Sequence, residues 1–203
     1  MFTFFDCETT GKPRDYKAPM TDLDNWPRVI QLAWLLADAE GNTVNQKEYF
    51  VTPDCWEVPV EQFWVNHGFS TERCKKEGIP MRQVLTEFVN DLNQSEYLIS
   101  HNINFDKNVV GAEMLRYEMR AKKLIKICTM ESSIDFCKLP FPGQREWFGK
   151  VTKTYKWPKL DELHVVLFGR SMEGGHQAGE DVTALKNCFF ELVKIGVIKL
   201  EII

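Results

Sequence analysis

The sequence predicts an α/β fold in which a mixed five-stranded sheet is flanked by helices. Three strand-like runs open the chain, and a tight turn between the second and third indicates an antiparallel meander. Helical and strand-like patterns then alternate, which is typical of a sheet with helices on its faces. A length of 203 residues with 44% hydrophobic residues suits one domain, residues 1–203, with a sizeable core.

The first three runs are predicted to be strands. Residues 1–7 begin with an apolar and aromatic stretch, and the Thr-Thr-Gly turn signal that follows leaves no room for a helix. Residues 28–38 are strongly apolar, which indicates a buried strand. Gly41 and Asn42 then mark a tight turn into the third run at 43–51.

The later part of the chain is predicted to alternate between helices and strands, because helical spacing of apolar residues is interrupted by two runs of four residues that match short strands. The tail at 196–203 is apolar, and we expect a final strand there rather than a contact with a partner. The other predicted elements are a helix at 80–93, a strand at 97–100, a helix at 104–120, a strand at 125–128, and helices near 159–167 and 178–194.

Four acidic residues are candidate ligands for hard divalent cations. Side chains alternate along a strand, so Asp6 and Glu8 share one face. Asp106 and Asp181 each head a helical stripe of apolar residues, where an unpaired acid costs free energy. Either one alone could instead cap its helix, but capping is the weaker account of all four acids. Carboxylate oxygens suit Mg²⁺ or Mn²⁺.

These acids belong to three short motifs: D-x-E at Asp6–Glu8, N-x-x-x-D at Asn102–Asp106, and H-x-A-x-x-D-x-x-A at His176–Ala184. The set resembles the DEDDh exonucleases of the DnaQ-like superfamily, which includes the proofreading epsilon subunit of bacterial DNA polymerase III, ribonuclease T and oligoribonuclease. Each motif alone is weak, but together they stand in family order. A sister group has a tyrosine where this chain has Gln177, which favours the histidine branch. The resemblance implies a ribonuclease H-like fold.

The resemblance also implies roles. Asp6, Glu8, Asp106 and Asp181 would hold two Mg²⁺ ions, with Mn²⁺ as a substitute, about 4 Å apart. His176 would take a proton from the water that attacks the terminal phosphodiester, a task that suits an imidazole whose ordinary pKa is near 6.5. The alternative is that His176 is a loop histidine without a special role.

Three further residues are expected to contact the substrate: Thr9, His67 and Asn102. Thr9 follows the first two acids directly, although a threonine in a turn is an equal alternative. His67 lies in a Val-Asn-His-Gly-Phe segment that resembles the corresponding part of the epsilon subunit, and a capping or surface histidine is as good an account. Asn102 belongs to the second motif, and the preceding His101 is expected to support the loop rather than perform chemistry.

Composition limits the other classes of function. No stretch approaches the 18 or so apolar residues that span a bilayer. The acid at position 6 comes too early for a signal peptide, so we expect a cytoplasmic protein. The six cysteines show no C-x-x-C spacing, which favours buried reduced thiols over disulfides or zinc.

Two segments depart from a minimal member of the family. Residues 12–27 form a long loop that could border the site or be a tolerated surface insertion. Residues 138–159 carry six basic residues, one acid and five interleaved aromatic residues, although the whole chain has a net charge of −4. Such a segment suits a polyanion, through phosphate neutralisation and base stacking. The alternative is a solvated basic loop.

The sequence therefore predicts a metal-dependent 3′→5′ exonuclease that acts on single-stranded 3′ ends of DNA and releases 5′-mononucleotides. An RNA-trimming exoribonuclease and a non-catalytic nucleic-acid-binding module are the alternatives. A polymerase or another replication or repair protein is the expected partner, no membrane is involved, and the oligomeric state is open.

Overall fold

The computed structural model describes residues 1–141, 155–172 and 178–200. It confirms the predicted mixed five-stranded sheet, whose strands lie in the order β3-β2-β1-β4-β5. The first three strands pair antiparallel, and β4 and β5 run parallel to β1. The strands are β1 (Phe2–Thr9), β2 (Val29–Ala37), β3 (Thr43–Phe50), β4 (Tyr97–Ser100) and β5 (Ile125–Cys128).

The four longer predicted helices are also confirmed, the last at its predicted ends and the others with shifted ends: α3 (Met81–Leu92), α4 (Ile103–Arg116), α7 (Leu160–Phe168) and α8 (Ala178–Lys194). Four short helices were not predicted, because a helix of one or two turns shows no recognisable apolar period. They are α1 (Gln62–Asn66), α2 (Thr71–Glu77), α5 (Thr129–Ser132) and α6 (Ile134–Cys137).

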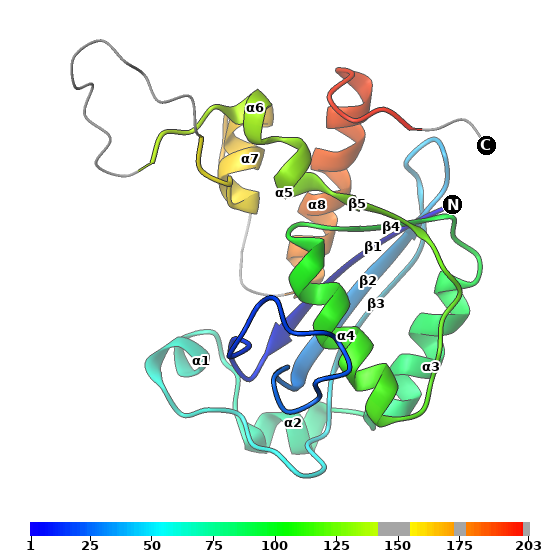
Figure 1. Ribbon diagram of the computed structural model, residues 1–203, viewed down its shortest axis with the longest axis vertical. Coiled ribbons are helices and arrows are strands. Elements are labelled where there is room, and N and C mark those ends of the chain that lie inside the picture. Colours follow the sequence, from blue (N-terminus) through cyan, green and yellow to red (C-terminus); the bar gives the residue numbers. More distant parts are fainter. Residues whose placement is uncertain (142–154, 173–177, 201–203) are drawn as a thin grey trace.

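Helices cover the two faces of the sheet in separate groups (Figure 1). Phe5, Leu32 and Trp34 pack with the buried residues of α3 and α4. The residues that alternate with these along β1 and β2, such as Phe4 and Ala33, point to the other face and pack with the apolar stripe of α8. The period of two along a strand therefore divides the core into two layers.

The loop at 12–27 is built into the molecule rather than placed loosely on its surface. Trp26 is 3% exposed, and its indole N–H donates to the Pro19 carbonyl. Met20 lies against Gly111 of α4, where an added Cβ would stand 1.8 Å from the Met20 sulfur. A side chain at position 111 would therefore require the Met20 side chain to move, and the glycine allows this close approach.

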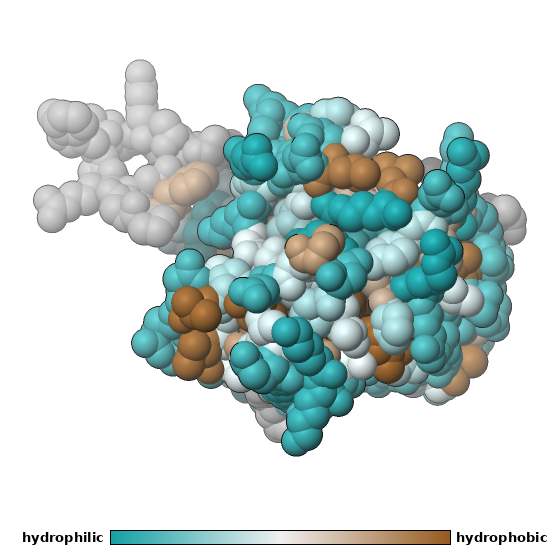
Figure 2. Space-filling model, turned by 90° about the horizontal axis from the view of Figure 1, so that it is seen from below, coloured by the Kyte–Doolittle hydropathy of each residue, from teal (hydrophilic) through white to brown (hydrophobic). Residues whose placement is uncertain are grey.

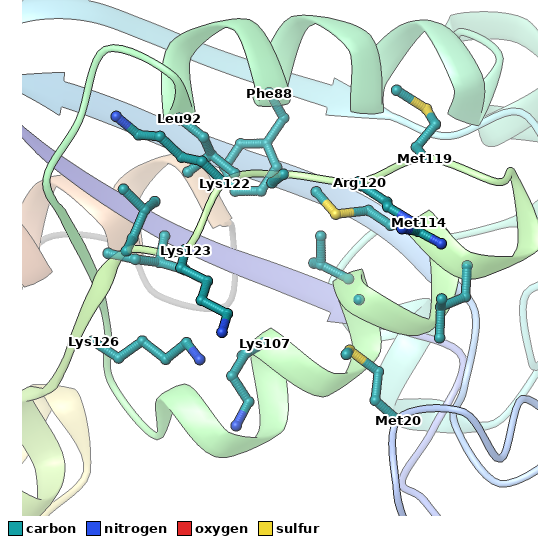
Figure 3. Close-up of a pocket in the computed structure, with 16 residues that line it drawn as sticks. Met20, Phe88, Leu92, Lys107, Met114, Met119, Arg120, Lys122, Lys123 and Lys126 are labelled. Atoms are coloured by element: carbon teal, nitrogen blue, oxygen red, sulfur yellow. The ribbon is translucent and has the colours of Figure 1, made fainter.

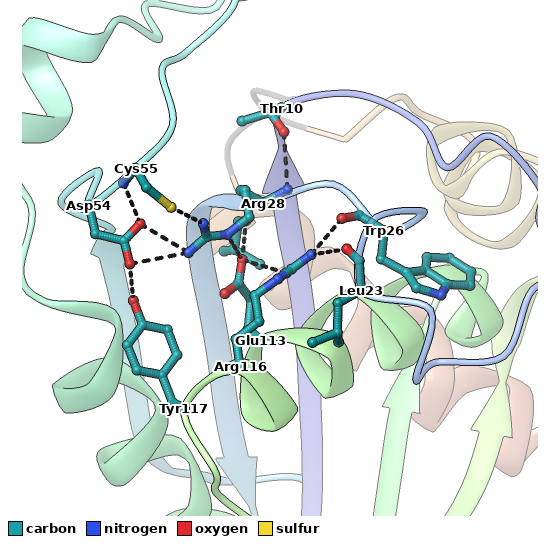
Figure 4. A network of polar contacts seen from close by, with 10 residues as sticks. Thr10, Leu23, Trp26, Arg28, Asp54, Cys55, Glu113, Arg116 and Tyr117 are labelled. Carbon is teal, nitrogen blue, oxygen red and sulfur yellow. Dashed lines mark hydrogen bonds and ion pairs between the residues drawn. The ribbon is translucent and has the colours of Figure 1, made fainter.

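A buried ionic network joins the same loop to β2 and α4 (Figure 4). The Arg28 guanidinium donates to Glu113 at 2.7 Å, and Glu113 is 1% exposed. Arg116 donates to the carbonyls of Leu23 and Trp26. Because a buried charge without a partner is costly, these contacts fix α4 against the sheet.

One prediction is wrong in the described residues. Residues 196–200 of the tail form no strand, and 201–203 lie outside the described residues. Ile198 is nevertheless 6% exposed, and Val197 and Leu200 pack against the α8 layer. The apolar character of the tail therefore reflects packing on the core rather than pairing with a sixth strand.

Four of the six cysteines agree with the prediction of buried thiols. All six are free, and Cys7, Cys74, Cys128 and Cys188 are buried, whereas Cys137 is half-buried and Cys55 is exposed. In the described ranges, no helix is both long and apolar enough to cross a membrane.

Candidate active site

Three of the four predicted acids meet where β1 ends. One carboxylate oxygen each of Asp6, Glu8 and Asp181 lies within 4.8 Å of the other two. Asp6 and Glu8 project from the same side of β1, as the strand period requires, and Asp181 lies in the first turn of α8. The fold thus brings residues 175 positions apart in the sequence into one group of potential ligands.

Asp106 enters the same region from the opposite face of the sheet. It lies in the first turn of α4 and is 3% exposed. The Ser100 hydroxyl at the end of β4 donates to one of its oxygens at 2.7 Å, and the Cys7 thiol donates to the other at 3.4 Å. The capping contact considered for Asp106 is therefore not its main role, because its oxygens are held by side chains of two strands.

The carboxylates raise one another's pKa. Burial raises the pKa of Asp6 well above its usual value, and the charges of Asp106, Asp181 and Glu8 raise it further. Burial and the charge of Asp181 raise the pKa of Glu8 to about 7. Burial also raises the pKa of Asp106 to about 6, although its two side-chain hydrogen bonds oppose this shift. The mutual repulsion of these carboxylates and their all-oxygen donor set fit a hard divalent cation.

Side chains of β2 and β3 hold the start of α8 in place. Gln31, which is 1% exposed, accepts from the Ala178 N–H at 3.2 Å and donates to Glu48 at 2.7 Å. Glu48 accepts from the Gly179 N–H at 3.3 Å. A Cβ on Gly179 would lie 2.5 Å from a Glu48 oxygen, so the glycine permits this approach. Two orphan amide groups of the helix are thereby satisfied, and Asp181 is placed over β1.

His176 and Gln177 lie outside the described residues, so the role of His176 remains a prediction. The helix that follows begins at Ala178, two residues later.

The predicted substrate residue His67 lies near the acids. It ends α1, and its charge lowers the pKa of Glu8, against the larger effects of burial and Asp181. Trp64 of the same helix donates its indole N–H to the Thr9 carbonyl at 3.0 Å, which ties α1 to the end of β1. The Thr9 hydroxyl donates to the Gly11 carbonyl at 2.7 Å, the contact expected of a threonine in a turn.

Apolar side chains are exposed on the same short helix. Phe63 is 45% exposed and Val65 is 57% exposed, and the Phe63 ring lies 4.4 Å from the His67 ring. Figure 2 shows a brown group at the left of this face, on the side where Figure 1 places α1. Apolar surface therefore borders the acids.

Asn102 and His101 shape the turn between β4 and α4. Asn102 has a left-handed backbone with φ of 78°, a conformation that asparagine tolerates better than most residues. His101 donates from Nε2 to the Pro158 carbonyl at 2.9 Å and accepts at Nδ1 from the Thr129 hydroxyl at 2.9 Å. The expectation that His101 supports the loop is confirmed by these contacts.

Solved structures with this fold include several of exonuclease I. The Escherichia coli enzyme in complex with a dT13 oligonucleotide superposes with a TM-score of 0.70 at 17% identity, over 95% of this chain and 40% of that chain. Its zinc-bound form with single-stranded DNA gives 0.68 at 15% identity, over 96% and 40%. Exonuclease I from Methylocaldum szegediense gives 0.68 at 20% identity, over 96% and 40%.

This likeness shows the fold, and it confirms the ribonuclease H-like architecture that the sequence motifs implied. The chain spans about 40% of the length of these enzymes. No protein-family model matches the sequence, and neither does any curated protein.

The hydrogen bonds that Gln31 makes with α8 and Glu48 lead to the first prediction. Gln31→Leu removes the acceptor of a buried N–H and the donor to Glu48, so the free energy of unfolding should fall by about 1–3 kcal/mol. Urea unfolding measures this change, and calorimetry should show weaker Mn²⁺ binding. Gln46→Leu is the matched control, because Gln46 makes only longer contacts at 3.3 and 3.4 Å. Equal effects of the two substitutions would contradict a specific role for Gln31.

The second prediction concerns His101. Burial lowers its pKa to about 4, from about 6.5 in the unfolded chain. A histidine whose pKa is lower in the folded than in the unfolded protein contributes stability at pH values above the unfolded pKa. This contribution is lost as the pH falls from about 6.5 to 4. It amounts to about 3 kcal/mol.

Wild type should therefore lose more stability than His101→Gln over that interval in urea unfolding. Parallel pH profiles of the two proteins would show that His101 is not neutral and buried in the folded state.

Proposed function

We propose that this protein is a metal-dependent 3′→5′ exonuclease acting on single-stranded DNA ends and releasing 5′-mononucleotides. The observation that carries the proposal is the meeting of Asp6, Glu8 and Asp181, with Asp106 beside them, at the end of β1. Asp106 is buried and the other three acids are half-buried. Mutually repelling carboxylates withdrawn from water are costly in a purely structural role, whereas they are the ligands that Mg²⁺ and Mn²⁺ prefer.

The four acids would hold two Mg²⁺ ions, or Mn²⁺ in their place. When bound, such ions supply positive charge for the attacking and leaving oxygens of a phosphodiester and lower the pKa of water. Gln31 and Glu48 set the position of Asp181 through the backbone of α8, and Ser100 and Cys7 orient Asp106. These four supporting side chains would therefore hold the acids in the geometry that the ions require.

His176 is proposed as the general base, from its place in the third motif. In the sequence it precedes Asp181 by five residues and the first residue of α8 by two. An imidazole there would take the proton of the attacking water.

Single-stranded DNA is the proposed substrate. Exposed Phe63 lies beside His67, near Glu8, and a ring at this place offers a surface on which a terminal base can stack. The exonuclease I structures with a similar fold were solved with oligonucleotides such as dT13 and dA16, which supports DNA as the first choice. The basic and aromatic segment at 138–159, most of which lies outside the described residues, is proposed to guide the strand.

The third prediction tests the acids. Asp6→Asn or Asp181→Asn should lower turnover of a 5′-labelled oligothymidylate by about 10³-fold or more, because each keeps the side-chain volume but removes a charged ligand. Glu180→Gln, an exposed neighbour in the same helix turn, is the matched control and should leave turnover unchanged. Gel analysis should show shortening from the 3′ end.

Hydrolysis that persists in excess EDTA would contradict the metal mechanism. Without added cation, the Asp6→Asn protein should unfold at higher urea than wild type, because mutual repulsion is relieved. This gain separates loss of a ligand from loss of the fold. A matched RNA strand distinguishes the exoribonuclease alternative. Tight DNA binding without any cleavage by wild type would indicate a non-catalytic binding module.

The fourth prediction concerns His176. His176→Ala should reduce turnover by about 10²–10⁴-fold while calorimetric Mn²⁺ affinity stays nearly unchanged. The wild-type rate should rise with pH through an apparent pKa that the variant lacks, and added imidazole should restore part of the lost rate. A variant with wild-type turnover would mean that His176 is a loop histidine without a catalytic role.

A further inference from the structure

A second site lies on the α3 and α4 face of the sheet. It is a pocket of about 350 Å³ between α3, α4 and residues 117–124, which connect α4 to β5 (Figure 3). Its floor is apolar and includes Leu98, Val110 and Met114. Its volume falls in the range of pockets that bind ligands. None of the four predicted metal ligands lines it.

The rim of this pocket is basic. Five cationic side chains line it, and several of them converge in Figure 3: Lys107, Arg120, Lys122, Lys123 and Lys126. In the described parts of the chain, none of the five forms an ion pair with a carboxylate; Lys122 donates to the Asn93 carbonyl and Lys107 to the Asn104 side chain.

The lysines also affect one another. Burial lowers the pKa of Lys107, and the charge of Lys126 lowers it further, although Glu131 opposes this. In a protein whose net charge is −4, five such cations around one recess make a local surplus of positive charge. Charge complementarity therefore favours an anionic occupant.

The apolar floor argues against a nucleic acid strand. Bases bind to single-strand sites by stacking on exposed aromatic rings. The one aromatic ring that lines this pocket is Phe88, which is 1% exposed and lies in the core. Aliphatic and thioether groups, such as those of Leu92, Met114 and Met119, instead suit an apolar side chain.

The position of the pocket also separates it from the acids. In Figure 1, residues 117–124 run on one side of α4, whereas the end of β1 that carries Asp6 and Glu8 lies on the other. A strand with its 3′ end at the acids would have to cross α4 to reach this pocket. A membrane is equally unsuited, because a membrane-binding face projects its apolar groups outward and these groups form the floor of a recess.

We propose that this pocket binds an acidic peptide segment of a partner protein, with an apolar side chain in the pocket and carboxylates at the basic rim. The inference does not depend on the nuclease proposal, because it uses none of the residues assigned to the metal site or to the strand.

A fluorescent peptide tests the proposal. The probe is a labelled peptide of glutamates and serines around a central Leu-Phe pair, and fluorescence anisotropy measures its affinity at low salt. Wild type should bind it with a dissociation constant in the micromolar range. Lys123→Ala combined with Lys126→Ala should weaken binding by about tenfold, since both side chains are exposed on the rim. The matched control is Lys75→Ala with Lys76→Ala, two exposed lysines of α2 outside the pocket, which should change little.

A second probe tests the apolar floor. Replacing the Leu-Phe pair by two serines should weaken binding at least as much as the loss of the two rim lysines. Equal affinity of the two peptides, or no measurable binding of either, would overturn the proposal.

Two further measurements distinguish the other anions. The Lys123 and Lys126 variant should keep wild-type affinity for an oligothymidylate, and wild type should not bind phosphatidylserine vesicles. If the variant loses the oligonucleotide as strongly as the peptide, the rim belongs to a nucleic-acid site. If wild type binds the vesicles and the variant does not, the rim recognises lipid headgroups. Either result would overturn the peptide assignment.

Discussion

The close grouping of several like charges, partly withdrawn from water, is the constraint on which the rest of the structure depends. Asp6, Glu8 and Asp181 meet at the end of β1, and each raises the cost of ionising its neighbours. Their surroundings keep them together despite this repulsion. Ser100 and Cys7, both in strands of the sheet, donate hydrogen bonds to Asp106. Side chains of β2 and β3 accept from the first amides of α8. The fold itself therefore sets the geometry of the four carboxylates.

Helix α4 shows how one element serves several environments. Its first turn places Asp106 at the acids, its middle packs through Gly111 against the 12–27 loop, and its later part buries Glu113 beside Arg28. Polar residues at buried positions weaken the apolar periodicity of such a helix. The tertiary contacts, rather than amphipathic character, therefore fix its orientation.

The sequence predicted what depends on local periodicity and on spaced motifs. The alternation along β1 and the stripe of α8 were sufficient to place Asp6 and Asp181 on core-facing surfaces. Gln31 and Glu48 were missed, because a polar residue in a strand gives no sign of a partner 147 or 131 residues away. The tail was misread because burial against a helix layer and pairing in a strand need the same apolar residues.

The outer strands of the sheet have a consequence for self-association. An open edge can recruit a strand from another copy and so start aggregation. Edge strand β3 is largely polar, and its Lys47 pairs with Glu87 and Asp91. The opposite edge, β5, is only four residues long and carries exposed Lys126. Charge at one border and shortness at the other disfavour continuation of the sheet between molecules, so the protein should resist fibrillar assembly even at high concentration.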